Sequence, residues 1–120
     1  MSARAVPPRD IAPADFFVRW VPASVSADDH RTARLGSTGA TLEFELTGEG
    51  GGWFHLRIGD GSVVGVEGAA PQPDLRVRLD METWRSLNAG EVSAPEAMLR
   101  RNLHLSGNLV LALKLHLILG

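Results

Sequence analysis

The feature that most constrains the fold of this chain is a hydrophobic pattern of period two that begins at Thr41. In the segment 41–47, Leu42, Phe44 and Leu46 alternate with polar residues. Such alternation is typical of a β-strand that buries one face and leaves the other in water. A chain with several such segments must place its helices on the buried side of the resulting sheet.

The same pattern continues in segments 53–58 and 62–67, which follow the first after short glycine-rich runs. The run 48–52 and the Gly-Asp-Gly run 59–61 are typical of hairpin turns, because glycine adopts a positive φ without steric cost. The sequence therefore predicts an antiparallel meander of three strands.

Two further strands are expected at 75–79, after the loop 68–73, and at 102–106. Two helical segments separate them, the first starting at the N-cap Asp80 and ending at Gly90, the second starting at the capping box formed by Ser93 and Glu96. This connection of about twenty residues is long enough to make the fourth and fifth strands parallel neighbours. The predicted fold class is α+β, a five-stranded mixed sheet with helices on one face.

The polar face of this sheet carries charges of both signs. It is expected to be solvated and to hold Glu43, Glu45, Arg57, Arg76, Arg78 and His104. Trp53 falls on this face or at the start of its strand, so it is expected at the surface, whereas Trp20 and Trp84 are expected in the core.

The segment Asp10–Val21 has apolar residues near helical spacing and is expected to form a helix with a broad aromatic face that ends at Pro22. Residues 1–8 are expected to be a flexible arm before a single domain at 9–120. The polar segment 25–39 is read either as a loop or as a weak second helix.

The run Leu109–Leu119 is apolar except for Lys114 and His116. Its period fits a strand or a helix, but its composition and the possible N-cap Asn108 favour a helix. Roughly 12 residues of helix extend about 18 Å, too short to cross a bilayer. Such a helix is expected to be buried, so Leu113→Glu should destabilise the protein. Its side away from the sheet is covered by the first helix, a second subunit or a ligand.

Composition and motifs argue against several functional classes. The net charge is −2 with no basic run, which disfavours nucleic acid, and cysteine is absent. The histidines His30, His55, His104 and His116 have no ligand spacing, and the Gly-rich run 48–52 lacks the Lys and helix of a phosphate loop. We expect a cytoplasmic protein with no enzymatic activity, metal or cofactor.

Two stretches resemble the sterol carrier protein 2-like lipid-binding domain. They read WFHLRIGDGSVVGVEGAAPQPDLRVRLDMETWRSLNAG (53–90) and LHLSGNLVLALKL (103–115). The first matches that family's order of strand, Asp-Gly turn, strand, strand and helix, and the second its closing strand, turn and helix. Asn108 stands where the family usually has Asp. The stretch 98–113, through Arg100-Arg101, also resembles accessory factors of ubiquinone biosynthesis.

The resemblance implies a non-enzymatic domain that binds a sterol, fatty acyl chain, phospholipid or polyprenyl compound in a cavity between sheet and helices. The residues expected to line this cavity are Phe16, Phe17, Trp20, Phe44, Leu46, Leu56, Val77, Trp84, Leu105, Leu109, Leu113 and Leu117. A membrane surface, a second copy of the chain or a partner enzyme are further expected contacts. The alternative is a scaffold subunit that holds such an enzyme through Trp53 and the Arg-rich sheet face.

Overall fold

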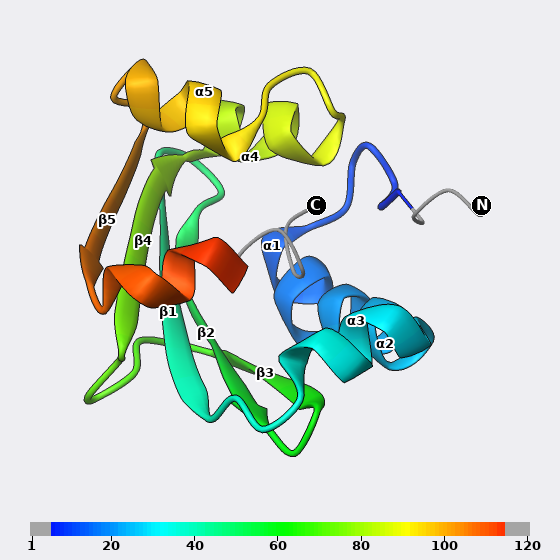
Figure 1. Cartoon of the computed structure of the whole chain (residues 1–120). Coiled ribbons are helices and arrows are strands. Elements are labelled where there is room, and N and C mark those ends of the chain that lie inside the picture. The colour runs from blue at the N-terminus through cyan, green and yellow to red at the C-terminus, as the bar shows by residue number, and fades with distance from the viewer. Residues whose placement is uncertain (1–5, 115–120) are drawn as a thin grey trace.

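The computed structural model describes residues 6–114 and has the predicted α+β architecture, with helices on one side of a five-stranded mixed sheet (Figure 1). The strands lie in the spatial order β3-β2-β1-β4-β5. Their bounds are β1 Ala40–Thr47, β2 Gly52–Gly59, β3 Ser62–Glu67, β4 Leu75–Asp80 and β5 Leu103–Gly107. Residues 1–5 and 115–120 lie outside the described part, so the flexibility of the predicted arm stays a prediction.

The directions of the strands differ from the expectation at one place. Strands β1, β2 and β3 form the predicted antiparallel meander, and β4 pairs with β1 in parallel. However, β5 pairs antiparallel with β4, with Val77 opposite Leu105, so the predicted parallel pairing was wrong. The two helices between these strands remain at one end of the sheet (Figure 1), and the chain therefore re-enters from the end at which it left.

The hairpin between β2 and β3 forms as predicted at Asp60 and Gly61. Their φ angles are 52° and 74°. Positive φ at both central residues matches the right-handed twist of the paired strands.

The N-terminal helical segment is longer than predicted. It consists of α1 (Pro13–Asp15), a π-helical turn η1 (Phe16–Trp20) and α2 (Val21–Ser26). Pro22 lies inside this segment and does not end it. In the π-helical turn the Val21 N–H donates to the carbonyl oxygen of Phe16, five residues earlier. With the same spacing, the Phe17 carbonyl would accept from residue 22, but Pro22 has no N–H to donate.

The Phe17 carbonyl oxygen packs against the backbone of Gly65 in β3. A Cβ atom added to Gly65 would lie 1.9 Å from the Phe17 oxygen, so only a glycine hydrogen fits between the strand and the π-helical turn. At this contact the backbone of the N-terminal helical segment packs directly against the backbone of the sheet.

The segment 25–39, for which the sequence left two readings, contains a helix. This helix, α3, spans Asp29–Leu35, and the Asp28 side chain caps it by accepting from the Arg31 N–H at 3.1 Å. Its last residue, Leu35, is buried in the core.

The helices α4 (Met81–Asn88) and α5 (Ala94–Leu99) begin at the predicted caps. Asp80 accepts from the Thr83 N–H at 3.3 Å, and Ser93 from the Glu96 N–H at 3.2 Å. Asn108 accepts from the Val110 N–H at 3.1 Å, but the element that follows, η2 (Leu109–Lys114), is a 3₁₀-helix. In the described part of the chain, no helix combines the length and hydrophobicity needed to cross a membrane.

Candidate functional site

The interior between the sheet and the helices is centred on Phe17, which is fully buried. Its ring centroid lies 4.8 Å from that of Phe44, 5.1 Å from Phe54, 5.0 Å from Phe16 and 6.3 Å from Trp84. Phe17 stacks with Phe54 and Trp84, meets Phe16 edge to face and is tilted against Phe44; stacked and edge-to-face pairs are stabilised beyond simple burial. This part of the interior is therefore packed core.

The residues predicted to line a cavity fall into four groups. Those that are buried, with at most 3% of the side chain exposed, are Phe16, Phe17, Phe44, Leu46, Leu56, Val77 and Trp84. Trp20 and Leu105 are partly buried against this core. Leu109 and Leu113 are exposed, and Leu117 lies outside the described residues.

The expectation that the C-terminal run is buried was wrong at Leu109 and Leu113, which are 58% and 74% exposed. Of the described residues of η2, Leu111 and Ala112 are the ones that are partly buried against the core. As a consequence, Leu113→Glu is now expected to leave stability almost unchanged, because the new charge stays in water.

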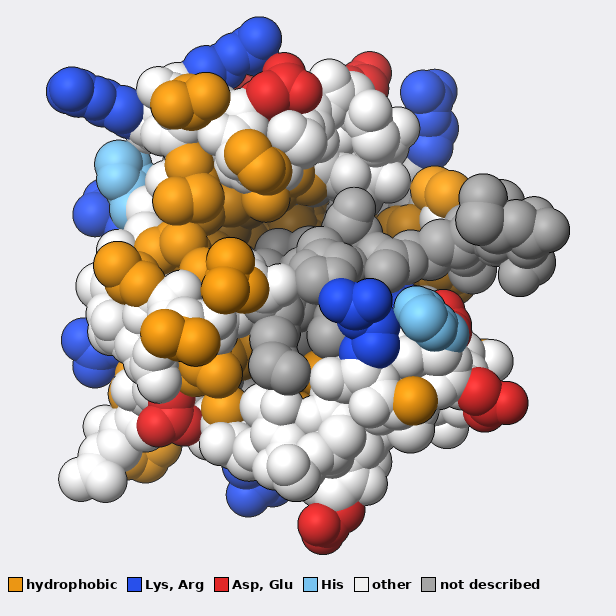
Figure 2. Space-filling view, in the orientation of Figure 1, with side chains coloured by type: hydrophobic (Ala, Val, Ile, Leu, Met, Phe, Trp, Pro, Cys, Tyr) orange, Lys and Arg blue, Asp and Glu red, His pale blue; other side chains and the backbone are white. Residues whose placement is uncertain are grey.

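Five large side chains form an exposed apolar surface on α5 and η2. These are Met98, Leu99, Leu109, Val110 and Leu113, and Leu99 is 85% exposed. Figure 2 shows hydrophobic side chains gathered over α5, β5 and η2. Scattered apolar residues are normal on a protein surface, whereas a contiguous group marks an interaction site. Met98 and Leu99 were not among the site residues expected from the sequence, which therefore missed this surface.

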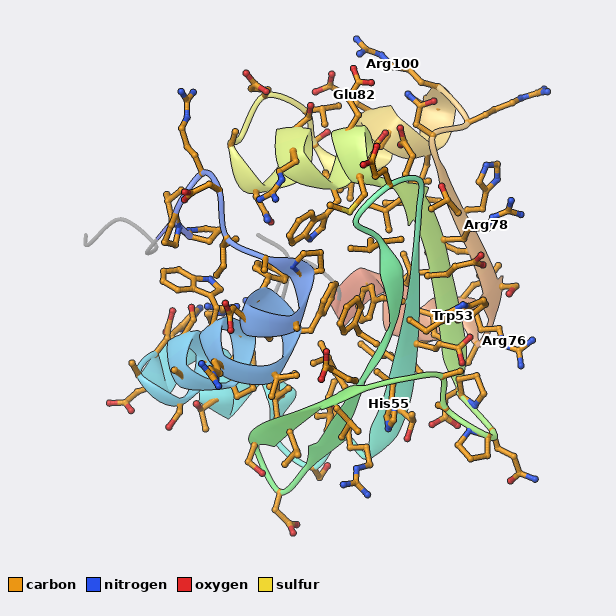
Figure 3. The ribbon with its side chains drawn as sticks, turned by 180° about the vertical axis from the view of Figure 1, so that it is seen from behind. Trp53, His55, Arg76, Arg78, Glu82 and Arg100 are labelled. Carbon is orange, nitrogen blue, oxygen red and sulfur yellow. The ribbon has the colours of Figure 1, made fainter. Side chains whose placement is uncertain are left out.

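The opposite, open face of the sheet holds a groove of about 480 Å³. The strand register aligns Trp53, Glu45, Arg78 and His104 in one row across β2, β1, β4 and β5. Trp53 is 46% exposed, as the sequence predicted. Arg78 Nε lies 3.8 Å from Glu45 Oε1, so charges of both signs are paired beside an accessible indole (Figure 3).

Glu43 was expected to be solvated, but this was wrong, because its side chain is only 3% exposed. The β3–β4 loop folds over it, and the Ala70 N–H donates to Glu43 Oε2 at 2.9 Å. Arg76 Nε lies 3.4 Å from the other carboxylate oxygen. Both partners compensate for the removal of this carboxylate from water.

The histidines of the open face do not form a pair. Strands β1 and β4 lie between His55 on β2 and His104 on β5. His55 Nδ1 is 2.9 Å from the Gly68 carbonyl oxygen, which can only accept, so Nδ1 carries the proton. Within residues 6–114 no three His, Asp or Glu side chains form a group that could hold a metal ion.

A comparison with protein families matches residues 22–120 to the SCP-2 sterol transfer family. No curated protein sequence matches the chain.

Solved structures share the fold at low sequence identity. Palmitated SCP2L2 from Aedes aegypti has 18% identity and a TM-score of 0.66, over 84% of this chain and 88% of that protein. The UbiJ-SCP2 ubiquinone synthesis protein has 16% identity and a TM-score of 0.52, over 85% and 82%. The inverting sec-alkylsulfatase Pisa1 from Pseudomonas sp. has 19% identity and a TM-score of 0.68, over 92% of this chain but only 17% of the enzyme.

Proposed function

The chain belongs to the SCP-2 sterol transfer family, and from this premise we propose that it binds and carries a lipid or another long apolar molecule. The candidates are a sterol, a fatty acyl chain, a phospholipid or a polyprenyl compound, held on the helix side of the sheet. We propose that the protein carries this ligand in the cytoplasm without changing it chemically. The sulfatase resemblance adds no catalytic role, because it covers only 17% of that enzyme.

The observation that supports this proposal is the exposed apolar surface on α5 and η2. Its side chains are 45–85% exposed, although they are Leu, Val and Met. Burial of ten ligand methylenes would contribute about 8 kcal/mol, which corresponds to a dissociation constant of about 1 μM before the entropy of ordering is subtracted. Aliphatic contact can therefore supply the main favourable free energy of binding.

We place the ligand against the exposed apolar surface of η2, where it would also contact Leu105 and Leu111. Both are only partly buried against the core, so a ligand there would complete their apolar contacts. The aromatic rings around Phe17 already contact one another, and in this proposal they form the floor of the site. The deeper cavity residues predicted from the sequence remain part of the proposal in that role.

The direct test is organic extraction of the gently purified protein, with mass spectrometry of the extract and titration with a fluorescent fatty acid. We expect a co-purified lipid and binding at micromolar protein. The double variant Leu109→Asp with Leu113→Asp should weaken binding at least about tenfold. Its melting temperature should hold, because both positions are exposed.

The matched control is Val64→Asp, which changes a 49% exposed valine on the edge strand β3. It should bind the fatty acid like the unmodified protein. An empty extract together with no titration signal would rule out the carrier proposal.

A scaffold role is the second candidate, favoured by the groove on the open sheet face. An accessible indole beside paired charges is typical of a protein contact, since aromatic residues and Arg are enriched in interfaces. The match to a ubiquinone synthesis protein makes an enzyme of isoprenoid-quinone biosynthesis the partner to test. The carrier and scaffold sites lie on opposite faces of the sheet and can be tested separately.

For the scaffold role, Trp53→Ala combined with Arg76→Glu should abolish pull-down of such an enzyme. Arg57→Glu is the control, because Arg57 is exposed on β2 and does not line the groove. Undiminished pull-down by the double variant would exclude this surface as the contact.

A further inference from the structure

The acidic and basic side chains of the open-face groove differ in exposure according to their sign. Two glutamates and two arginines line the groove, so their formal charges cancel. The side chains of Arg76 and Arg78 are 60% and 64% exposed, whereas those of Glu43 and Glu45 are only 4% and 28% exposed. A molecule that approaches the groove therefore meets guanidinium groups before it meets carboxylates.

Both guanidinium groups have free hydrogen-bond donors. The closest contact of each to its glutamate is through Nε, at 3.4 Å for Arg76 and 3.8 Å for Arg78. Within residues 6–114 neither guanidinium donates a hydrogen bond. The planar fork of an arginine matches the two oxygens of a carboxylate, and such a charged pair is stronger than a hydrogen bond between neutral groups. Each arginine therefore presents a binding group for one carboxylate.

The spacing of the two arginines matches that of an extended peptide. Arg76 and Arg78 are two residues apart on β4, so they share one face of the sheet with about 7 Å between their Cα atoms. Alternate residues of any extended segment have the same spacing. Strand β1 already shows this match, because the register places Glu43 beside Arg76 and Glu45 beside Arg78. A second Glu-X-Glu segment therefore fits the exposed side of the same arginines.

Trp53 adds an apolar contact to this surface. It is 46% exposed and lies in the same cross-strand row as Arg78, two strands or about 10 Å away. Accessible aromatic residues beside arginines are typical of the residues that contribute most to protein interfaces. A partner segment that reaches both residues would carry an apolar side chain next to its acidic ones.

We propose that the groove binds an acidic, extended segment of a partner protein, with carboxylates on alternate residues and an apolar side chain beside them. The inference rests on the proposed scaffold role and specifies the chemistry of the partner. It is independent of the carrier role. An anionic membrane or a nucleic acid is a poorer match, because its continuous negative charge would also face Glu45, whereas a peptide can place an uncharged residue there.

The test uses two fluorescein-labelled peptides, one containing Ser-Glu-Val-Glu-Phe-Ser and one with Gln in place of both Glu. Fluorescence anisotropy with the full chain should show that the acidic peptide binds at least about tenfold more tightly. Raising the NaCl concentration from about 0.05 M to about 0.5 M should reduce this difference, because salt screens exposed charges.

Arg78→Gln should weaken binding of the acidic peptide about tenfold and leave the Gln peptide unaffected, because it removes one partner of the two carboxylates. Its circular dichroism spectrum should be unchanged, since the Arg78 side chain is 64% exposed. Arg57→Gln is the matched control. Arg57 is exposed on β2 but does not line the groove, so this variant should bind both peptides like the unmodified protein.

Several outcomes would overturn the inference. Equal binding of the two peptides would show that the contact is apolar. Equal losses in Arg78→Gln and Arg57→Gln would show that affinity follows the net charge of the protein and not the groove. Binding to phosphatidylglycerol vesicles that is lost in Arg78→Gln would identify a membrane as the occupant.

An absence of binding by either peptide would also overturn the inference, and the enzyme pull-down then decides the scaffold role separately. If Trp53→Ala combined with Arg76→Glu abolishes the pull-down, the scaffold role stands with a partner of different chemistry. If the pull-down is undiminished, the scaffold role and this inference are both excluded.

Discussion

Replacement of Gly65 by alanine is expected to lower the free energy of unfolding by more than about 4 kcal/mol or to prevent folding. The added Cβ would lie 1.9 Å from the Phe17 oxygen, 2.7 Å from the Phe17 carbonyl carbon and 2.8 Å from Val18 Cα. All three atoms belong to the backbone, so no change of rotamer relieves the overlap. The π-helical turn would have to move off β3, and the aromatic core beneath it would open.

Gly59→Ala is the matched control for this experiment. Gly59 ends β2, and a Cβ atom there would meet no atom within 4 Å. The Gly59→Ala variant should have an unchanged or slightly higher free energy of unfolding, because alanine lowers the conformational entropy of the unfolded chain. Urea unfolding monitored by circular dichroism measures both variants, and equal midpoints for Gly65→Ala and Gly59→Ala would contradict the close contact.

The second large effect is expected for Phe17→Ala, with a loss of about 3–5 kcal/mol. Phe17 is 0% exposed and meets four aromatic rings, from Phe16, Phe44, Phe54 and Trp84. These rings come from η1, β1, β2 and α4, so they cannot close together over the space that the missing ring leaves. The loss therefore includes a cavity contribution as well as the lost transfer free energy.

Trp53→Ala provides the comparison, since it removes an even larger ring from the open face of the sheet. Trp53 is 46% exposed, and its replacement should cost far less than that of Phe17. Guanidinium unfolding followed by the fluorescence of the remaining tryptophans separates the two variants. A loss at Phe17 no greater than at Trp53 would show that the aromatic cluster does not form the stabilising core.

Local signals predicted much of the fold because they act within a few residues. The caps Asp80 and Ser93 accept hydrogen bonds from N–H groups three residues ahead, and the Asp60-Gly61 turn depends on its own backbone angles. The alternation in 41–47 depends only on which side of a strand each residue occupies. Such signals do not require knowledge of distant segments.

Long-range contacts account for the predictions that were wrong. The direction of β5 depends on whether α4 and α5 cross the sheet or remain at one end, and both paths have the same sequence length. The helix continues through Pro22 because the Phe17 carbonyl faces Gly65 of β3, more than forty residues along the chain. Glu43 is buried because the β3–β4 loop folds back over it.

The same difference between local signals and long-range contacts applies to the candidate site. The seven buried residues predicted for it were found by periodicity, but periodicity does not distinguish a packed core from a cavity wall. The exposure of Leu99, Leu109 and Leu113 could not be predicted from the sequence, because it depends on whether another element of the fold covers these side chains.

The sequence by itself determined a one-sided sheet, its hairpins and the start of each capped helix, since periodicity and capping are properties of adjacent residues. Only the tertiary structure decided that the apolar run after Asn108 begins as a 3₁₀-helix with three large side chains exposed. The physical reason is that burial is a property of the surrounding elements. The run is apolar in any fold, but the position of α5, β5 and the sheet sets how much of it they cover.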